Sequence, residues 1–112
     1  MTTKDHYYSH TTNEAANIFE FGTLLIQTGH IEFGTVSSST DYKDVSITFT
    51  KKYSVTPTIV VGFDWGSDSA NAGRWSICCR AEGTDGFIAR VNNGEGAGRN
   101  PEGYWIAIGK KA

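Results

Sequence analysis

Short runs in which apolar and polar residues alternate, separated by glycine-rich turns, constrain this fold more than any other feature of the sequence. In the clearest run, Val45, Ile47 and Phe49 alternate with polar residues. A period of two places every second side chain on the same face of a β-strand. Thirteen glycines and only two prolines accompany these runs, and no long helical period interrupts them. The chain is therefore predicted to be all-β.

Six strands are expected, at residues 23–36, 42–50, 58–65, 74–81, 86–92 and 104–109. Gly29 is expected to mark a bulge or kink in the first strand. The strands follow one another through short turns, such as "EGTDG" at 82–86, and this favours antiparallel pairing. The predicted fold is a six-stranded antiparallel β-sandwich. We assign residues 22–112 to this domain and residues 1–21 to a polar lead or stalk segment, in which 12–19 could form a short helix.

Charge and hydropathy exclude several classes of partner. The formal net charge of −2 provides no uniform field for nucleic acid or for an anionic membrane. No apolar run approaches the roughly 18 residues that a membrane-spanning helix needs. The N-terminus lacks the basic and then apolar layout of a signal peptide. We expect cytoplasmic synthesis, no nucleic-acid partner and no insertion into a membrane.

The adjacent residues Cys78 and Cys79 are predicted to be packing residues. A disulfide between neighbours would be strained, and two adjacent thiols without a nearby histidine do not make a zinc site. The alternation of the strand predicts that Trp75, Ile77 and Cys79 face the core, while Cys78 shares the polar face with two arginines. No metal and no cofactor are expected.

Three apolar residues are predicted to point away from the core. If Tyr104, Ile106 and Ile108 face inward, these outward residues are Val60, Ile88 and Trp105. Strands that are apolar on both faces are normally covered on both faces, and a single small sandwich cannot cover its own outside. We expect other copies of the chain to cover these residues. The alternative is that they are scattered surface residues.

The longest irregular segment after the N-terminus is "NNGEGAGRNPEG", residues 92–103. It carries Asn93, Glu95 and Arg99, whose amide, carboxylate and guanidinium groups suit sugar hydroxyls but equally suit any solvated loop. No nucleophile elbow, paired catalytic carboxylates or nucleotide-binding motif can be identified. The chain is therefore predicted not to be an enzyme, and no catalytic residue is assigned.

Four segments resemble the H-type lectins, the sugar-binding domains of snail agglutinins and of the discoidin C-terminus. "IQTGHIEFG" resembles their opening strand, and "VSITFTKKYSVTPTIVVGF" resembles the next two. "RWSICCRAEGTDGFIARV" resembles their hairpin, and "YWIAIG" their closing strand. The similarity spans about residues 25–109. It implies a six-stranded sandwich that trimerises side by side, and related small trimeric β-heads cap the tail fibres of bacteriophages.

The resemblance also implies site residues. Arg74 matches an arginine that contacts sugar in the family, and Asp41 is the nearest counterpart of the family's aspartate. Gly94 and Glu95 stand where the family has an aromatic residue and a histidine, which leaves N-acetylgalactosamine specificity unsupported. Phe33 and Val91 stand where snail-type members have a disulfide. The full set of expected ligand contacts is Arg74, Asn93, Glu95, Asp41, Asp64, Trp65 and Arg99.

These observations lead to one hypothesis and two alternatives. The hypothesis is a non-catalytic receptor-binding head of a phage or prophage tail that binds a host-surface glycan or wall polysaccharide. It would act in the virion as a homotrimer or higher assembly, joined to other tail proteins through its N-terminus. The alternatives are a structural virion or assembly module without a sugar site, and a soluble lectin unconnected with phage.

Overall fold

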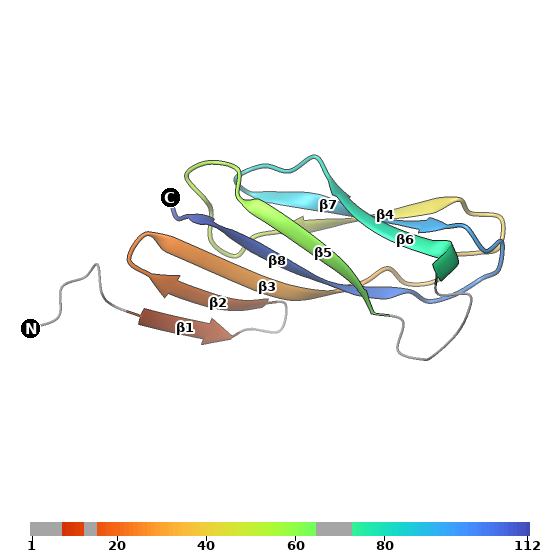
Figure 1. The fold of residues 1–112 in the computed structure, drawn as a ribbon, viewed down its shortest axis with the longest axis horizontal. Coiled ribbons are helices and arrows are strands. Elements are labelled where there is room, and N and C mark those ends of the chain that lie inside the picture. The colour runs from red at the N-terminus through yellow and green to blue at the C-terminus, as the bar shows by residue number, and fades with distance from the viewer. Residues whose placement is uncertain (1–7, 13–15, 65–72) are drawn as a thin grey trace, which may run out of the picture.

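The computed structural model describes residues 8–12, 16–64 and 73–112, and these residues form two antiparallel β-sheets (Figure 1). The five-stranded sheet has the order β1 (Tyr8–Thr12), β2 (Ala16–Phe21), β3 (Leu24–Glu32), β8 (Glu102–Lys110) and β5 (Thr58–Asp64). The three-stranded sheet has the order β4 (Tyr42–Thr48), β7 (Gly86–Asn93) and β6 (Trp75–Arg80). The predicted all-β class with two antiparallel sheets is confirmed. Among the described residues, no helix has the length and apolar character to cross a membrane.

The six predicted strands correspond to β3 through β8, and β1 with β2 adds a hairpin at the edge of the larger sheet. The short helix expected over 12–19 is wrong, because Ala16–Phe21 is a strand paired with β3. Ile18 on β2 is only 1% exposed and belongs to the core. Burial of this side chain and pairing with β3 outweigh the weak local preference for a helix.

The bulge or kink expected at Gly29 is also wrong. The pairing of β3 with β8 runs without a break from Leu24 opposite Lys110 to Glu32 opposite Glu102. Gly29 lies opposite Trp105 in this register. The side chains of a cross-strand pair share one face, so the missing side chain at Gly29 leaves room for the indole.

The orientation of β8 is the reverse of the predicted one. Trp105 is 3% exposed and lies in the core, with its ring centroid 5.7 Å from that of Phe49 and 5.7 Å from that of Phe87. Tyr104, which was expected inside, is 52% exposed, and Ile106 and Ile108 are exposed as well. This strand is apolar on both faces, so alternation alone cannot tell which face is inside. The indole fits between the sheets beside Phe49 and Phe87, opposite Gly29, and this fit decides which face is inside.

A buried amide fastens the connection between β4 and β5 to the larger sheet. Gln27 is fully buried, and its Nε2 donates to the carbonyl oxygen of Lys51 at 2.9 Å. The amide nitrogen of Lys51 donates back to Gln27 Oε1 at 3.1 Å. Further along, the hydroxyl of Tyr53 donates to the carbonyl oxygen of Ala107 at 2.9 Å. These bonds hold the connection against the sheet without leaving its buried polar groups unpaired.

The predicted alternation in β6 is confirmed. Trp75 is buried, Ile77 and Cys79 pack against the core, and Cys78 is exposed. Both thiols are free, and burial raises the pKa of Cys79. The aligned pair Phe33 and Val91, which the resemblance places at a disulfide, are both buried in the core.

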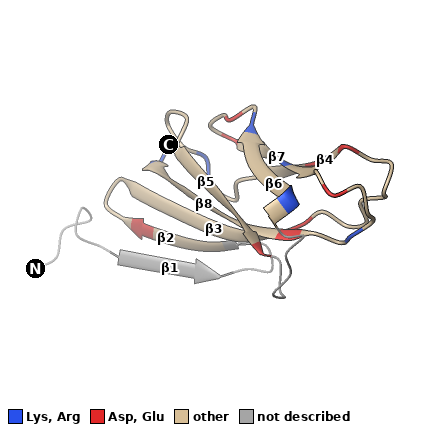
Figure 2. Cartoon of the chain, turned by 45° about the vertical axis from the view of Figure 1, so that its right-hand side comes forward, with Lys and Arg blue, Asp and Glu red and all other residues tan. Residues whose placement is uncertain are grey.

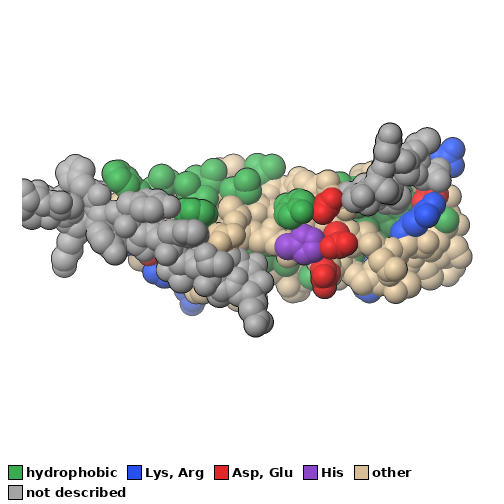
Figure 3. All heavy atoms as spheres, turned by 90° about the horizontal axis from the view of Figure 1, so that it is seen from below, with side chains coloured by type: hydrophobic (Ala, Val, Ile, Leu, Met, Phe, Trp, Pro, Cys, Tyr) green, Lys and Arg blue, Asp and Glu red, His purple; other side chains and the backbone are tan. Residues whose placement is uncertain are grey.

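The outer face of the five-stranded sheet carries a band of exposed apolar side chains. The middle parts of β3, β5 and β8 carry no charged residues (Figure 2). A row of hydrophobic side chains follows this face and ends at a histidine with acidic neighbours (Figure 3). We call this surface the apolar face, and its exposed large residues are Phe21, Leu24, Val60, Tyr104, Ile106 and Ile108.

Candidate functional site

The strongest candidate site lies at the end of the sandwich away from the C-terminus (Figure 1). Two loops, 33–41 and 94–101, meet there beside the end of β7 and the start of β6, and we call this region the loop end. Val36 and Arg99 exchange backbone hydrogen bonds of 2.8 and 2.9 Å between the two loops. The amide of Asn93 donates to the carbonyl oxygen of Asp41 at 2.7 Å. The loops therefore form one bonded unit.

The side chain of Asn93 organises the second loop. Its Oδ1 accepts from the amides of Glu95 and Gly96, each at 3.0 Å. Its Nδ2 donates to the carbonyl oxygens of Ala97 at 3.1 Å and Ser37 at 3.3 Å. Gly96 adopts a φ of 78°, which favours glycine. The Asn93 side chain therefore uses its hydrogen bonds to hold the second loop together and to join it to the first loop.

The carboxylate of Glu95 is the electrostatic centre of the loop end. Its Oε2 accepts from Trp75 Nε1 at 2.7 Å and from Arg99 Nε at 3.1 Å, and its Oε1 accepts from Arg99 Nη2 at 2.5 Å. The side chain is only 6% exposed. The hydrogen bonds from Arg99, followed by the one from Trp75, lower the pKa of Glu95 to about 2. Glu95 is therefore an ionised anchor for the loop.

Arg74 lies exposed at the start of β6, next to this anchor. Its positive charge contributes to the lowered pKa of Glu95. Within the described part of the chain, its guanidinium makes no hydrogen bond or ion pair. Gly94 packs directly on the backbone of Arg74, where a Cβ would overlap the carbonyl oxygen. Among the residues that the structure describes, the guanidinium of Arg74 thus has no partner, and the backbone that carries it packs against Gly94.

Of the other expected ligand contacts, one lies at the loop end, one lies on the larger sheet and one lies outside the described residues. Asp41 contributes its backbone carbonyl to the loop end, and its side chain is exposed. Asp64 lies on the larger sheet, where it accepts a hydrogen bond of 2.9 Å from the hydroxyl of Tyr104 and raises the pKa of that tyrosine. Trp65 lies outside the described residues. The loop end therefore joins Arg74, Asn93, Glu95 and Arg99 but not Asp64.

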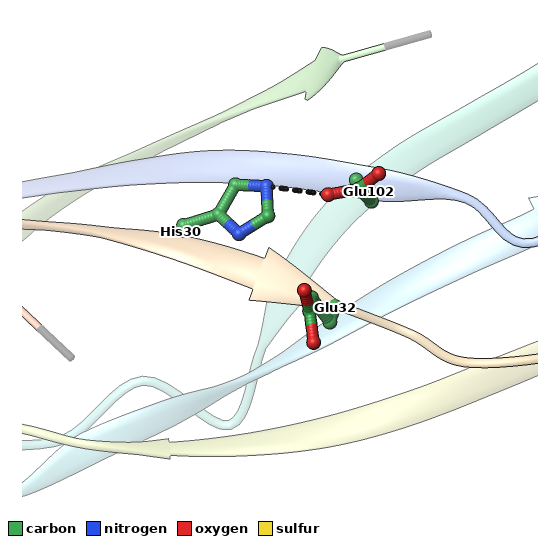
Figure 4. A group of neighbouring side chains, drawn as sticks. All are labelled: His30, Glu32 and Glu102. Carbon is green, nitrogen blue, oxygen red and sulfur yellow. Dashed lines mark ion pairs between the residues drawn. The ribbon is translucent and has the colours of Figure 1, made fainter. Parts of the chain in front are cut away.

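A second group of polar side chains was not found from the sequence. His30, Glu32 and Glu102 lie together on the outer surface of the larger sheet, and His30 Nε2 lies 2.9 Å from Glu102 Oε1 (Figure 4). One ligand atom from each residue lies within 4.8 Å of the others, so together they could contact a cation. Each of the three side chains is exposed. In the sequence, the i, i+2 spacing places His30 and Glu32 on the same face of a strand. Glu102 joins them only through the pairing of β3 with β8, which the sequence does not show.

A hollow of about 230 Å³ adjoins this group. Glu32 and Glu102 line it together with Gly34, Asn100 and Pro101. The hydroxyl of Thr35 donates to Asn100 Oδ1 at 2.9 Å beside this hollow. Carboxylates and an amide oxygen at a shallow hollow can accept hydrogen bonds from sugar hydroxyls.

No protein-family model and no curated protein matches the sequence, but solved structures share its fold. An R1-type pyocin tail fibre superposes with a TM-score of 0.72 at 15% identity, over 92% of this chain and 85% of that one. An R2-type pyocin tail fibre gives 0.56 at 21% identity, over 93% of this chain and 38% of the other. The tailspike of Acinetobacter baumannii bacteriophage AP22, solved with capsular saccharide, gives 0.57 at 16% identity, over 78% of this chain and 17% of the other. The chain therefore has a fold that occurs within pyocin tail fibres and a phage tailspike.

Proposed function

We propose that this chain is the receptor-binding head of a phage or prophage tail, and that its loop end binds a host-surface saccharide without cleaving it. The observation that carries the proposal is the exposed guanidinium of Arg74, which has no partner among the described residues and whose backbone packs on Gly94 beside the Glu95–Arg99–Trp75 network. Because the backbone under Arg74 is already held by the loop, only the arginine side chain needs to be ordered on binding. The fold shared with tail fibres and with a saccharide-bound tailspike supports this setting.

The head is proposed to be a homotrimer that uses the apolar face. Val60 keeps its predicted place in this contact, and Tyr104, Ile106 and Ile108 replace Trp105, which lies in the core. Ile88 lies on the outer side of the other sheet and is left out of the contact. A contiguous apolar surface of this kind is typical of a protein–protein contact. Three heads would give the avidity that a weak individual site needs.

One observation favours a second candidate, a structural tail module without a sugar site. Asn93, Glu95 and Arg99 are bonded to one another or to the loop backbone, as expected of a loop built only for rigidity. In that case Arg74 would be an ordinary surface residue. The two candidates differ in whether the isolated head binds any saccharide.

The test is an array of bacterial surface polysaccharides probed with the fluorescently labelled head. The parent is expected to bind at least one polysaccharide, and Arg74→Gln is expected to weaken that binding by about tenfold, the scale of one charge-assisted hydrogen bond. Lys111→Gln is the matched control, because it removes the same charge at the opposite end of the sandwich and lies outside the apolar face. No binding by the parent would favour the structural module, whereas equal binding by Arg74→Gln would show that the saccharide is bound elsewhere than at Arg74.

A further inference from the structure

The outer side of the three-stranded sheet carries a polar surface that contains none of the expected ligand contacts. Its neighbouring outward positions on β4, β7 and β6 combine two guanidiniums with a tyrosine ring, an amide, a hydroxyl and one carboxylate. We call this surface the arginine face, and its residues are Tyr42, Asp44, Ser76, Arg80, Arg90 and Asn92.

Two arginines of this face share a single carboxylate. Arg90 Nε donates to Asp44 Oδ1 at 2.8 Å, and Arg90 Nη2 donates to Asp44 Oδ2 at 3.1 Å. Arg80 Nη1 donates to the same Oδ2 at 3.2 Å. The group therefore keeps one net positive charge. Within the described parts of the chain, most of the N–H groups of Arg80 have no acceptor, and its side chain is exposed.

An aromatic ring is held beside these charges. The guanidinium carbon of Arg90 lies 3.8 Å from the centroid of the Tyr42 ring, which orients the ring through a cation–π contact. Tyr42 itself is half exposed. Its cross-strand neighbour Asn92 donates from Nδ2 to Ser76 Oγ at 3.3 Å. A row of ring, amide and hydroxyl groups thus crosses the sheet next to the charged group.

The chemistry of the arginine face favours one class of ligand. An exposed ring and an amide suit the faces and hydroxyls of sugar rings, while spare guanidinium donors suit carboxylates. Nucleic acid is less suitable, because its affinity comes from many phosphate contacts and this face offers only one net positive charge. The apolar face lies on the opposite sheet, so an assembly through that sheet leaves the arginine face open to solvent.

We propose that the arginine face binds an acidic polysaccharide of the uronic-acid type along the side of the head. This inference rests on the proposed function and deepens it, because it names a charged saccharide and a second contact surface beside the loop end. Arg80, Arg90 and Tyr42 make the contact, and Asp44 holds the two guanidiniums in position.

Cys78 provides a direct probe of this surface. It is exposed and lies opposite Arg90 in the strand pairing. In a Cys79→Ala background, the alkylation of Cys78 by neutral iodoacetamide can be followed by mass spectrometry at increasing concentrations of polygalacturonate. We expect polygalacturonate to slow the reaction and dextran, a neutral polymer, to leave it unchanged. High salt should remove the protection.

Two variants complete the test in the same background. Arg80→Gln should weaken the apparent affinity for polygalacturonate by about tenfold, the scale of one charge-assisted hydrogen bond, because Asp44 stays bonded to Arg90 and the fold is kept. Lys111→Gln, at the end of the chain and outside the apolar face, should change nothing. The proposal would be overturned if polygalacturonate did not slow the alkylation of Cys78 in the parent. It would also be overturned if polygalacturonate slowed this reaction equally in the parent and in Arg80→Gln. Equal protection by a DNA oligonucleotide would also overturn it, because the surface would then accept any polyanion.

The two experiments distinguish failure of the arginine-face proposal from failure of the proposed receptor-binding function. A head that binds a surface polysaccharide through Arg74 but shows no effect of Arg80→Gln keeps its receptor role and loses only the lateral surface. A head that binds no polysaccharide in either experiment loses both.

Discussion

The indole N–H of Trp75 donates to the Glu95 carboxylate at 2.7 Å, which ties the first residue of β6 to the loop that follows β7. Arg99 binds the same carboxylate from further along that loop. One nearly buried anion therefore joins a core tryptophan to the surface that presents Arg74. The shape of the candidate site depends on the charge of Glu95.

The first prediction concerns acid stability. The pKa of Glu95 falls from 4.5 to about 2 on folding, so ionised Glu95 stabilises the fold above about pH 4.5. This contribution is lost as the pH falls through about 2. Glu95→Gln should therefore lower the free energy of unfolding at pH 6, and its difference from the parent should shrink between pH 4.5 and pH 2.

Urea denaturation at a series of pH values, followed by far-UV circular dichroism, measures that difference. The pH dependence of the parent alone does not isolate Glu95, because the pKa values of Glu20 and Asp44 are lowered as well. The comparison with Glu95→Gln isolates one carboxylate. A difference between the two proteins that stays constant over this pH range would contradict the assignment.

The second prediction concerns the buried amide of Gln27. Gln27→Leu would leave the backbone N–H and carbonyl of Lys51 without their partners, at a cost of about 1–3 kcal/mol in the free energy of unfolding. Ser46→Ala, at an exposed position of β4, should stay within about 0.5 kcal/mol of the parent. Urea denaturation at neutral pH measures both values. Equal stabilities of the two variants would show that the Gln27 bonds contribute little.

The third prediction concerns assembly. Val60 is 60% exposed on the apolar face, and Val55 is 64% exposed in a turn outside it. Light scattering of the parent should give a mass near three times 12.2 kDa. Val60→Asp should dissociate the trimer, because the contact would bury a charge without a partner. Val55→Asp should not.

The outcome of this experiment is decisive for the apolar face. A parent that is monomeric at micromolar concentration would remove the proposed trimer altogether. Equal effects of the two aspartates would mean that any added charge disturbs the protein. Circular dichroism of each variant separates loss of assembly from loss of fold.

The sequence predicted the strands well where only one face of a strand is apolar. In β4, Val45 and Ile47 pack against the core, and polar residues separate them. In β8 both faces are apolar, and the predicted orientation was wrong for Trp105 and Ile106. The fit of the indole between the sheets decides this orientation, and that fit involves residues distant in the sequence.

The candidate site could be predicted only in part, for a related reason. Arg74, Asn93 and Glu95 were identified as polar residues near strand ends, and the structure places them together. The role of Glu95 as an anchor depends on Trp75, twenty residues away. The contact between His30 and Glu102 depends on the pairing of β3 with β8. Such contacts are set by tertiary structure and leave no local pattern.

The last prediction tests whether the geometry of the loop end determines binding. A Cβ on Gly94 would overlap the carbonyl oxygen of Arg74, so Gly94→Ala must push the loop away from the start of β6. We expect this variant to lose about tenfold in polysaccharide affinity, as Arg74→Gln does, although every polar side chain of the site is retained. Gly73→Ala is the matched control, because a Cβ there meets no atom of the described residues within 4 Å, apart from its chain neighbours. The fluorescent array measures binding, and circular dichroism confirms that each variant is folded. Full binding by Gly94→Ala would mean that Arg74 acts without a rigid base, whereas equal losses in both alanine variants would point to a general effect of replacing glycine.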